Sequence, residues 1–307
     1  MEKIIIGICT HNRNRTLDIC LEKINTMCLP ANATLELVVI DNYGNANAQS
    51  VIDKFQNNKY KINYFATKTN SIAESRNYCL EKCLEANPDY IAFIDDDEYP
   101  NNNWLNTFYN YINETDADIL TGPVISKFVD NDLNEIEIPK HLRKNFLFNL
   151  HKKRETGDIC TTCATNNVFI NAKILKETPV FFDENFNKMS GEDLDFFTRL
   201  AQKGHKILWC KEASVNEFVP PNRCTLKYIL KRNFNNGYLR IFMKKKYKNI
   251  NIKNHINTLI NILIFTLTLP FSILLGKTQF INNLGLCAFN IGALRSSFTD
   301  KTYNFYK

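Results

Sequence analysis

Short apolar runs rich in β-branched side chains alternate with longer segments of helical periodicity over the first 120 residues. The runs at residues 4–8, 35–40 and 90–94 are too short for helices and predict buried strands. Between them, apolar side chains recur at helical spacing over residues 17–27, and residues 72–84 contain neither Pro nor Gly. This alternation of strands and helices predicts a parallel sheet wrapped by helices, with ligands bound at the C-terminal ends of the strands.

The pattern changes after residue 225. Apolar positions recur at helical spacing over residues 226–242 among many Lys and Arg, whereas residues 256–276 and 278–294 contain no charged residue. A basic amphipathic helix lies well on an anionic membrane, although an ordinary helix packed on the protein has the same pattern. The first charge-free stretch has the length of a bilayer span but contains Asn257, Asn261 and Pro270. A hairpin in one leaflet therefore competes with two spans, and either form predicts membrane attachment.

The charge is divided unevenly along the 307 residues. Residues 1–217 contain 24 Lys and Arg against 31 Asp and Glu, a net −7, and residues 218–307 contain 14 against 1, a net +13. The C-terminal third therefore calls for an acidic partner, either nucleic acid or an anionic membrane. Nucleic-acid arms do not usually continue into long uncharged stretches, so we expect a membrane surface and no nucleic acid. Basic residues before residue 256 predict that this end faces the cytoplasm.

Ten cysteines raise the question of disulfides or a metal site. The first three residues lead straight into an apolar run, which leaves no room for a signal peptide, so we expect a reducing cytoplasm and free thiols. Cys160 and Cys163 have the spacing of half a zinc site, but no second pair of ligands accompanies them. We therefore expect buried thiols.

Polar side chains follow each of the three predicted strands. The first strand ends at residues 10–13 (Thr-His-Asn-Arg), the second at Asp41, and the third at four consecutive acids, residues 95–98. Asp and Asn also begin ordinary turns, which accounts for Asp41 as well as a functional role does. Four adjacent acids repel each other, and a divalent cation with oxygen ligands offsets that repulsion most easily.

Five motifs in order resemble those of family 2 glycosyltransferases, enzymes with the GT-A-type nucleotide-sugar fold. They span about residues 1–220 and comprise residues 8–13 (T-x-N-R), 39–42, 70–77 (N-x-x-x-x-x-R-N), 93–100 (D-x-D) and 165–169 (T-x-N), followed by the Glu-Asp pair at 192–193. Ser71 and Ser75 stand where the family more often has Gly and Ala. The resemblance implies a mixed, mostly parallel α/β sheet flanked by helices, followed here by a helical, membrane-associated region.

The resemblance also implies roles on the donor side. Asp97 is the expected metal ligand, supported by Asp95, and the metal is Mn²⁺ or Mg²⁺, which neutralises the leaving diphosphate as a Lewis acid. Asp41 is expected at the nucleobase, and Asp96 is open to either a donor or a metal role. The remaining residues expected at the donor are Thr10, Asn12, Arg13 and Arg76.

On the acceptor side, the resemblance makes Asp193 the base that deprotonates the attacking hydroxyl, which gives inversion at the anomeric carbon. Glu192 and Asn167 are expected near the sugar or acceptor. A Glu-Asp pair also simply favours a helix start, which is the structural alternative. Glu217 stands where many relatives have a metal-contacting His, and it is an alternative oxygen ligand.

The expected function is transfer of a single sugar from a nucleotide sugar to a lipid-linked or cell-envelope glycan, because the Q-x-x-R-W motif of processive synthases is absent. A polyprenyl-phosphate sugar synthase is the alternative enzyme, and a non-catalytic sugar- or nucleic-acid-binding membrane protein is the alternative from another class. We expect three parts: a catalytic domain at 1–220, a basic amphipathic segment at 221–254 and a hydrophobic membrane-associated region at 255–307. The expected location is the cytoplasmic face of a membrane.

Overall fold

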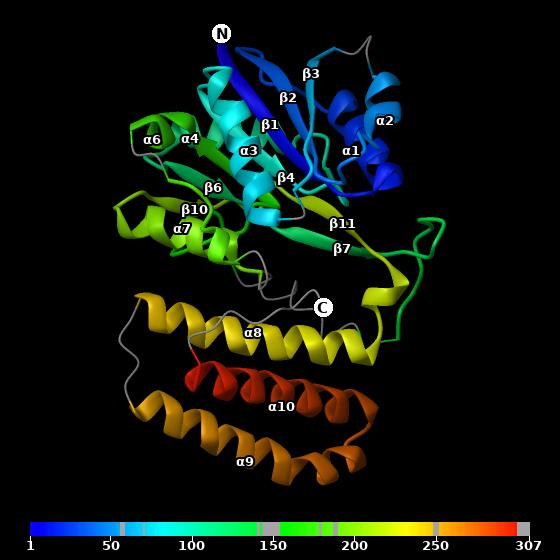
Figure 1. Ribbon diagram of the computed structural model, residues 1–307, viewed down its shortest axis with the longest axis vertical. Coiled ribbons are helices and arrows are strands. Elements are labelled where there is room, and N and C mark those ends of the chain that lie inside the picture. The colour runs from blue at the N-terminus through cyan, green and yellow to red at the C-terminus, as the bar shows by residue number, and fades with distance from the viewer. Residues whose placement is uncertain are drawn as a thin grey trace. The chain divides into compact units, whose positions relative to one another are not determined.

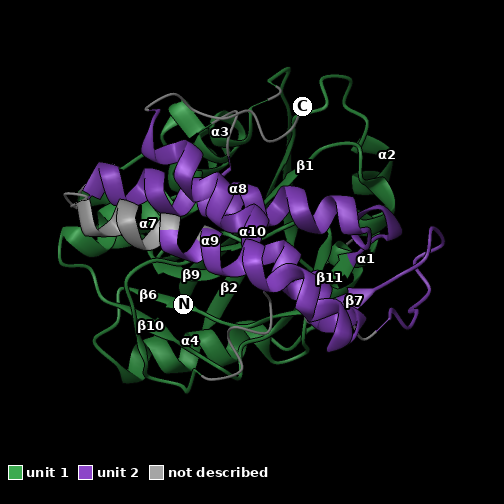
Figure 2. Ribbon diagram, turned by 90° about the horizontal axis from the view of Figure 1, so that it is seen from below, with its two compact units in different colours: residues 1–126, 151–187, 192–218 green, residues 127–150, 188–191, 219–307 purple. Residues whose placement is uncertain are grey.

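The computed structural model describes residues 1–55, 59–69, 71–139, 142, 154–177, 180–186, 190–247 and 252–299. The chain divides into two compact units (Figure 2). The sheet unit comprises residues 1–126, 151–187 and 192–218, and the helical unit comprises 127–150, 188–191 and 219–307. The three-part division expected from the sequence stays a prediction.

A mixed eight-stranded sheet forms the centre of the sheet unit, in the order β3-β2-β1-β4-β9-β6-β10-β8. Strands β1, β2, β3 and β4 run parallel to one another, whereas β9 runs antiparallel to both neighbours. A smaller sheet has the order β5-β11-β7. The strands are β1 (Glu2–Thr10), β2 (Ala33–Asp41), β3 (Lys61–Ala66), β4 (Tyr90–Ile94), β5 (Glu98–Pro100), β6 (Ile119–Thr121), β7 (Val124–Phe128), β8 (Ile159–Cys160), β9 (Asn167–Asn171), β10 (Ile207–Trp209) and β11 (Val215–Val219).

Helices cover both faces of the large sheet (Figure 1). Alternate residues of β1 point to opposite faces: Ile4 and Ile6 join the core cluster that contains α1 and α4, and Ile5 joins the cluster that contains α3 and α7. Gly7 allows α3 to lie close, because a Cβ there would be 2.8 Å from the Cys79 sulfur. The helices are α1 (Asn14–Thr26), α2 (Gln49–Asp53), α3 (Ile72–Glu85), α4 (Trp104–Glu114), α6 (Ala172–Glu177) and α7 (Glu192–Gln202), with a 3₁₀ turn at η2 (Glu184–Phe186).

The predicted strands at 4–8, 35–40 and 90–94 are confirmed as β1, β2 and β4, and the predicted helices as α1 and α3. The α/β class is confirmed with them. The sequence pattern did not indicate α2 and β3, because β3 is a mostly half-buried edge strand without a continuous apolar run. All ten cysteines are free, as expected.

Three long helices dominate the helical unit: α8 (Leu226–Tyr247), α9 (Ile252–Leu274) and α10 (Lys277–Ser297), preceded by a 3₁₀ turn at η3 (Pro221–Arg223). Helix α10 packs against both α8 and α9. The backbones of α8 and α10 touch, since a Cβ on Gly237 would lie 1.8 Å from the Phe289 carbonyl oxygen and one on Gly292 would lie 1.9 Å from that of Phe234. Only glycine permits this approach.

The apolar positions of α8 are therefore used within the protein. Tyr238 and Ile241 are buried, as is Ile229, which joins a small core cluster with Ile138 and Val219. Over the described residues, none of the helices combines the length and the apolar character needed to cross a bilayer.

Candidate active site

The three polar strand ends meet at one edge of the sheet. Strand β1 lies between β2 and β4, and Thr10 at its end is the register partner of Asp41. The Thr10 hydroxyl donates a hydrogen bond of 2.7 Å to Asp96, which follows β4. The sheet order thus brings together side chains that are more than 80 residues apart in sequence.

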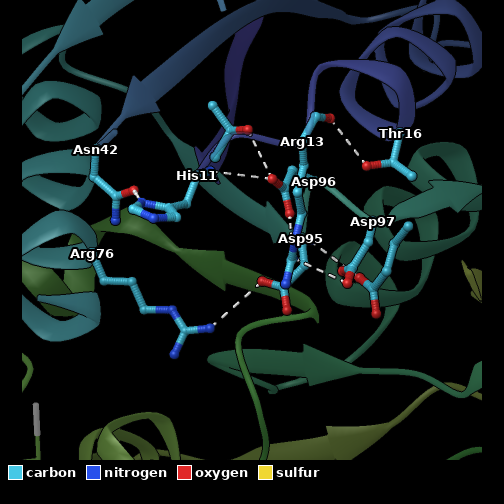
Figure 3. Close-up of polar contacts among 10 residues, drawn as sticks. His11, Arg13, Thr16, Asn42, Arg76, Asp95, Asp96 and Asp97 are labelled. Atoms are coloured by element: carbon cyan, nitrogen blue, oxygen red, sulfur yellow. Dashed lines mark hydrogen bonds and ion pairs between the residues drawn. The ribbon is translucent and has the colours of Figure 1, made fainter. Parts of the chain in front are cut away.

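Arg13 holds two of the four consecutive acids (Figure 3). Its Nη1 lies 2.7 Å from Asp96 Oδ1 and 3.0 Å from Asp97 Oδ2. The Asp96 carboxylate is buried, and its Oδ2 accepts from the Thr10 hydroxyl and from the His11 backbone N–H. In this structure Asp96 ties the loop after β1 to the end of β4, and its predicted donor role stays a prediction.

Asp41 organises the loop that follows β2. It is fully buried, its Oδ1 accepts from the Tyr43 N–H, and its Oδ2 accepts from the Ala48 N–H and the Tyr64 hydroxyl. Every bond in this set stabilises the protein itself. The predicted nucleobase contact of Asp41 stays untested, and the loop it shapes is the part that borders the site.

A chain of hydrogen bonds links the β1 loop to α3. His11 Nδ1 lies 2.7 Å from Asn42 Oδ1, and Asn42 Nδ2 donates to the Ser75 hydroxyl, which in turn donates to the Ser71 carbonyl. The Ser71 side chain caps α3 by accepting from the Glu74 N–H. The serines at 71 and 75, where the family more often has Gly and Ala, are therefore part of this hydrogen-bonded chain.

Arg76 on α3 connects two of the predicted motifs. Its Nη2 lies 3.5 Å from Asp95 Oδ1 (Figure 3), and its Nη1 forms an ion pair with Glu192 Oε1 at the start of α7. The next residue, Asn77, exchanges two hydrogen bonds with the backbone of Phe182. Arg76 thus faces the acids, while Asn77 fixes α3 to the chain before α7. Asn70, at the start of the same motif, lies outside the described residues.

The predicted base, Asp193, lies in the first turn of α7 and is partly exposed. Its Oδ1 accepts from the neighbouring Leu194 N–H. Gly191 precedes the helix with a φ of +101°, a conformation that favours glycine, and the helix is followed by Gly204 at +97°. Helix α7 lies between these glycines and begins at the Glu-Asp pair, which the sequence indicated as a helix start.

Glu98, the last of the four consecutive acids, has a second glutamate beside it. Glu98 on β5 faces Glu217 on β11 in antiparallel register, and both are buried. Glu98 Oε1 accepts from Asn166 Nδ2, and the β11 backbone bonds to Asp97 through the Phe218 N–H. Sequence reasoning included Glu98 among the four acids but did not predict its contact with Asn166, because no spacing rule shows which side chain of a motif faces its neighbour.

Two of the expected residues lie elsewhere in the network. Asn167 is buried, its Nδ2 donates to the Pro123 and Ala213 carbonyls, and its Oδ1 accepts from the Trp104 indole. Asn12 has a φ of +53° and accepts from Asn47 at the exposed end of the β1 loop. The sugar or donor roles expected for both residues stay predictions.

Burial controls the protonation of the clustered acids. It raises the pKa of Asp96 and Glu98, and the like charges of neighbouring acids raise it further. Burial lowers the pKa of Arg13 and Arg76, but the carboxylates around them outweigh it and raise both above the ordinary value. Burial also raises the pKa of Glu192, to about 7, in spite of Arg76. The site therefore holds two permanent cations beside three buried carboxyl groups of raised pKa, Asp96, Glu98 and Glu192.

The oxygen atoms of Asp95 and Asp97 are of the hard type that Mg²⁺ and Mn²⁺ prefer. Asp95 is the more open of the two, with 40% of its side chain exposed against 12% for Asp97. Over the described residues no three His, Cys, Asp or Glu side chains form a group that could hold a metal alone. The donor set fits a cation that takes further ligands from a bound diphosphate.

The sequence model of the glycosyl transferase family 2 matches residues 5–177, which include β1, the acid cluster and Arg76. The chain belongs to this family. It is a glycosyltransferase, as the motifs at the strand ends predicted.

This chain is 29% identical over 241 residues to a curated relative, the succinoglycan biosynthesis protein ExoM of Rhizobium meliloti (strain 1021). That match covers 76% of this chain and 72% of ExoM. This chain is also 28% identical over 232 residues to chondroitin synthase of Pasteurella multocida (strain Pm70). That match covers 65% of this chain but only 23% of the synthase.

Solved structures show the same fold. Residues 1–349 of S. aureus TarS in complex with UDP superpose with a TM-score of 0.54 at 15% identity, covering 95% of this chain and 90% of that one. GalNAc-T7 with UDP, GalNAc and Mn²⁺ gives a TM-score of 0.54 at 14% identity, covering 78% and 51%. The predicted GT-A-type α/β fold is thereby confirmed.

Proposed function

We propose that this glycosyltransferase moves a single sugar from a nucleoside-diphosphate sugar to a hydroxyl of a glycan acceptor, with inversion at the anomeric carbon. The observation that carries the proposal is the position of Arg76, which contacts Asp95 after β4 and Glu192 at the start of α7. One cation therefore joins the acids expected at the donor to the pair expected at the acceptor. Both halves of a transfer reaction need such proximity.

In the proposed reaction, Asp193 accepts the proton of the acceptor hydroxyl while that oxygen forms a bond to the anomeric carbon. The bond from that carbon to the donor diphosphate breaks, and its electron pair leaves with the diphosphate. Arg76 orients Glu192 beside the base, and Arg13 supplies positive charge next to the diphosphate. The exposed half of Arg13 is consistent with a guanidinium that reaches a ligand.

We further propose that Asp97 and Asp95 hold Mg²⁺ or Mn²⁺ together with the donor diphosphate. Such an ion supplies Lewis-acid stabilisation of the leaving group when bound. GalNAc-T7 contains Mn²⁺ with UDP in the same fold, which supports the proposal. Glu98 and Glu217 face each other in the register of β5 and β11, and Glu98 accepts a hydrogen bond from the Asp95 N–H, which helps to position Asp95.

For the acceptor we propose a growing envelope polysaccharide or its lipid-linked precursor. The names of two relatives, a succinoglycan biosynthesis protein and a chondroitin synthase, support polysaccharide biosynthesis. TarS binds UDP-GlcNAc in a chain of this fold, which makes a UDP-sugar the first donor to try. A polyprenyl phosphate is the alternative acceptor.

We also propose action on the cytoplasmic face of a membrane. The basic residues before residue 256 support this orientation through the positive-inside rule.

The test is a screen of UDP-, GDP- and dTDP-sugars by calorimetric binding and by nucleotide release, with Mn²⁺, with Mg²⁺ and with chelator. We expect one nucleotide sugar to bind, with affinity and release both lost in chelator. Asp97→Asn should weaken metal-dependent binding about tenfold or more. The matched control is Asp18→Asn, which removes a carboxylate paired with Lys54 outside the site and should leave binding unchanged.

Binding is measured beside turnover because a missing acceptor stops turnover alone. If no nucleotide sugar binds under any metal condition, the proposal is wrong. If the donor binds equally well with chelator and in Asp97→Asn, the metal role is wrong although donor binding stands.

A further inference from the structure

Helix α9 presents a continuous apolar stripe to solvent. The exposed side chains on it include Leu267, Phe271 and Leu274, at 61%, 68% and 84% exposure. With Ile260, Leu263 and Ile264, these residues fall within about one third of the circumference of α9, and Ile273, also exposed at 60%, lies outside this sector. The side chains of Phe265, Leu269 and Ser272 are less exposed and lie on the opposite face, which is where α9 packs on α10.

The other two helices of the helical unit do not present such a stripe over their described residues. Helix α10 was the second charge-free stretch in the sequence, yet it lies between α8 and α9 and buries Ile281, Cys287 and Ala293. Helix α8 buries Tyr238 and Ile241 and touches α10 through Gly237. Among the three long helices, the exposed apolar surface is therefore concentrated on α9. A contiguous exposed apolar patch of this kind marks an interaction site.

The charge of the helical unit indicates what covers this stripe. Helices α8, α9 and α10 contain ten Lys and Arg and no Asp or Glu. Within the sequence, Lys253 and Lys277 bracket the apolar segment of α9. Two copies of so basic a unit would repel each other, whereas an anionic lipid surface attracts it and accepts the apolar stripe.

We propose that α9 lies in the plane of an anionic membrane, with its apolar stripe inserted at the boundary between headgroups and acyl chains. The helix neither spans the bilayer nor needs α8 to bind. Pro270 fits this arrangement, because a helix at the interface can satisfy a freed backbone carbonyl with water. This inference does not depend on the proposed reaction and would hold for any activity of the sheet unit.

The first experiment is cosedimentation of the full chain with vesicles. Phosphatidylcholine vesicles with about 30% phosphatidylglycerol should bind at least about tenfold more tightly than phosphatidylcholine alone, and added salt should reduce the difference. The double variant Leu267→Glu/Phe271→Glu should weaken binding about 10- to 100-fold. Its matched control is Ile159→Glu/Leu226→Glu, which adds the same charge at exposed apolar positions on β8 and α8 and should bind normally.

A second experiment reports the depth of insertion. Both native tryptophans, Trp104 and Trp209, are buried in the sheet unit and respond little to vesicles. Phe271→Trp should shift its emission to shorter wavelength on vesicles and be quenched by lipids brominated near the headgroup end of the chains. Ile159→Trp is the control and should show neither change.

Circular dichroism and urea unfolding of the double variant confirm that it is folded before its binding is interpreted. Normal vesicle binding by the folded double variant would overturn the proposal. A second result would also overturn it: the wild-type protein is a dimer in sedimentation equilibrium, the double variant is a monomer, and neither binds vesicles. The stripe would then be an interface between copies of the chain. Quenching of Phe271→Trp only by lipids brominated at the bilayer centre would overturn the in-plane geometry.

Discussion

The candidate active site of the sheet unit is built mainly from acidic side chains, whereas the three long helices of the helical unit contain no acidic residue. At the sheet edge, Asp95, Asp96 and Asp97 crowd around two arginines, and burial raises the pKa of Asp96. In the helical unit, α8 and α10 are held together by glycine contacts, and the ten charged residues of α8, α9 and α10 are all Lys or Arg. Under the two proposals made above, turnover and membrane location are assigned to different parts of one chain.

Such a division predicts that each property can be lost without the other. Changes at the sheet edge should reduce turnover and leave vesicle binding intact. Changes on α9 should do the reverse when the acceptor is supplied in solution.

The largest expected effect is that of Asp97→Ala. Turnover should fall about 10³-fold, because the leaving diphosphate loses its counterion, while binding to phosphatidylglycerol vesicles stays at the wild-type level. Parallel assays of nucleotide release and cosedimentation check both halves. A variant that loses both properties while remaining folded would contradict the division.

Asp193→Asn should lower kcat about 10²- to 10⁴-fold with little change in donor affinity, because an amide cannot accept the proton. Rapid-quench turnover and donor calorimetry separate the two quantities. Asp18→Asn is the control, because it makes the same substitution outside the site and should leave kcat unchanged. Near-normal kcat in Asp193→Asn would assign the base to another group and leave the donor site standing.

In the helical unit, Gly292→Leu should destabilise the packing of α8 on α10 by about 3 kcal/mol, since a Cβ there meets the Phe234 carbonyl oxygen. The readout is trypsin cleavage at the ten basic residues of the helices, which should become accessible. Ile291→Leu, at the exposed neighbouring position, should keep the wild-type cleavage rate. Equal rates for the two variants would mean that the close contact does not hold the helices.

Arg76→Lys tests the link between the donor and acceptor sides. A lysine keeps the charge but cannot contact Asp95 and Glu192 with two separate nitrogens, so kcat/KM should fall about tenfold. The fall should appear in kcat/KM for the acceptor as well as for the donor. An effect confined to donor affinity would remove the proposed bridging role.

The smallest effect concerns pH. Because the pKa of Glu192 is raised from 4.5 to about 7 in the folded protein, that form binds its proton more tightly than the unfolded chain does. The contribution to stability is complete below about pH 4.5 and is lost as the pH rises through about 7. Glu192→Gln should flatten this part of the profile, measured as urea midpoints at pH 5 and pH 8. An unchanged slope would show that Glu192 does not titrate in that window.

The sequence predicted the part of the fold that follows from local patterns. Continuous β-branched runs mark β1, β2 and β4 because these strands are buried on both faces. It did not predict β9 running antiparallel between β4 and β6, since strand direction depends on how the chain returns to the sheet and not on composition. Nor could it distinguish α9 from α10, whose sequences are both free of charge over long stretches but whose burial is opposite.

At the site, the motifs identified the residues but not their contacts. His11, for which the sequence offered no partner, bonds to Asn42 from the next strand. Asp41 was expected at the nucleobase and Asn167 at the sugar or acceptor. In the structure, Asp41 accepts hydrogen bonds from the loop after β2, and Asn167 accepts one from the buried Trp104 indole. These contacts join residues between 2 and 63 positions apart, and the longer ones arise only once the strands have paired.

Because α10 packs between α8 and α9, the chain cannot be shortened before the end of α10 without exposing packed helix faces. An expression fragment that stops between α9 and α10 would leave the packing faces of both α8 and α9 uncovered, including Gly237, Phe265 and Leu269. Such a fragment would be prone to aggregation for reasons unrelated to lipid binding. Anyone preparing the protein for crystals should keep the chain through Ser297 and replace apolar residues on the outer face of α9 instead, which lowers surface hydrophobicity without disturbing the helix packing.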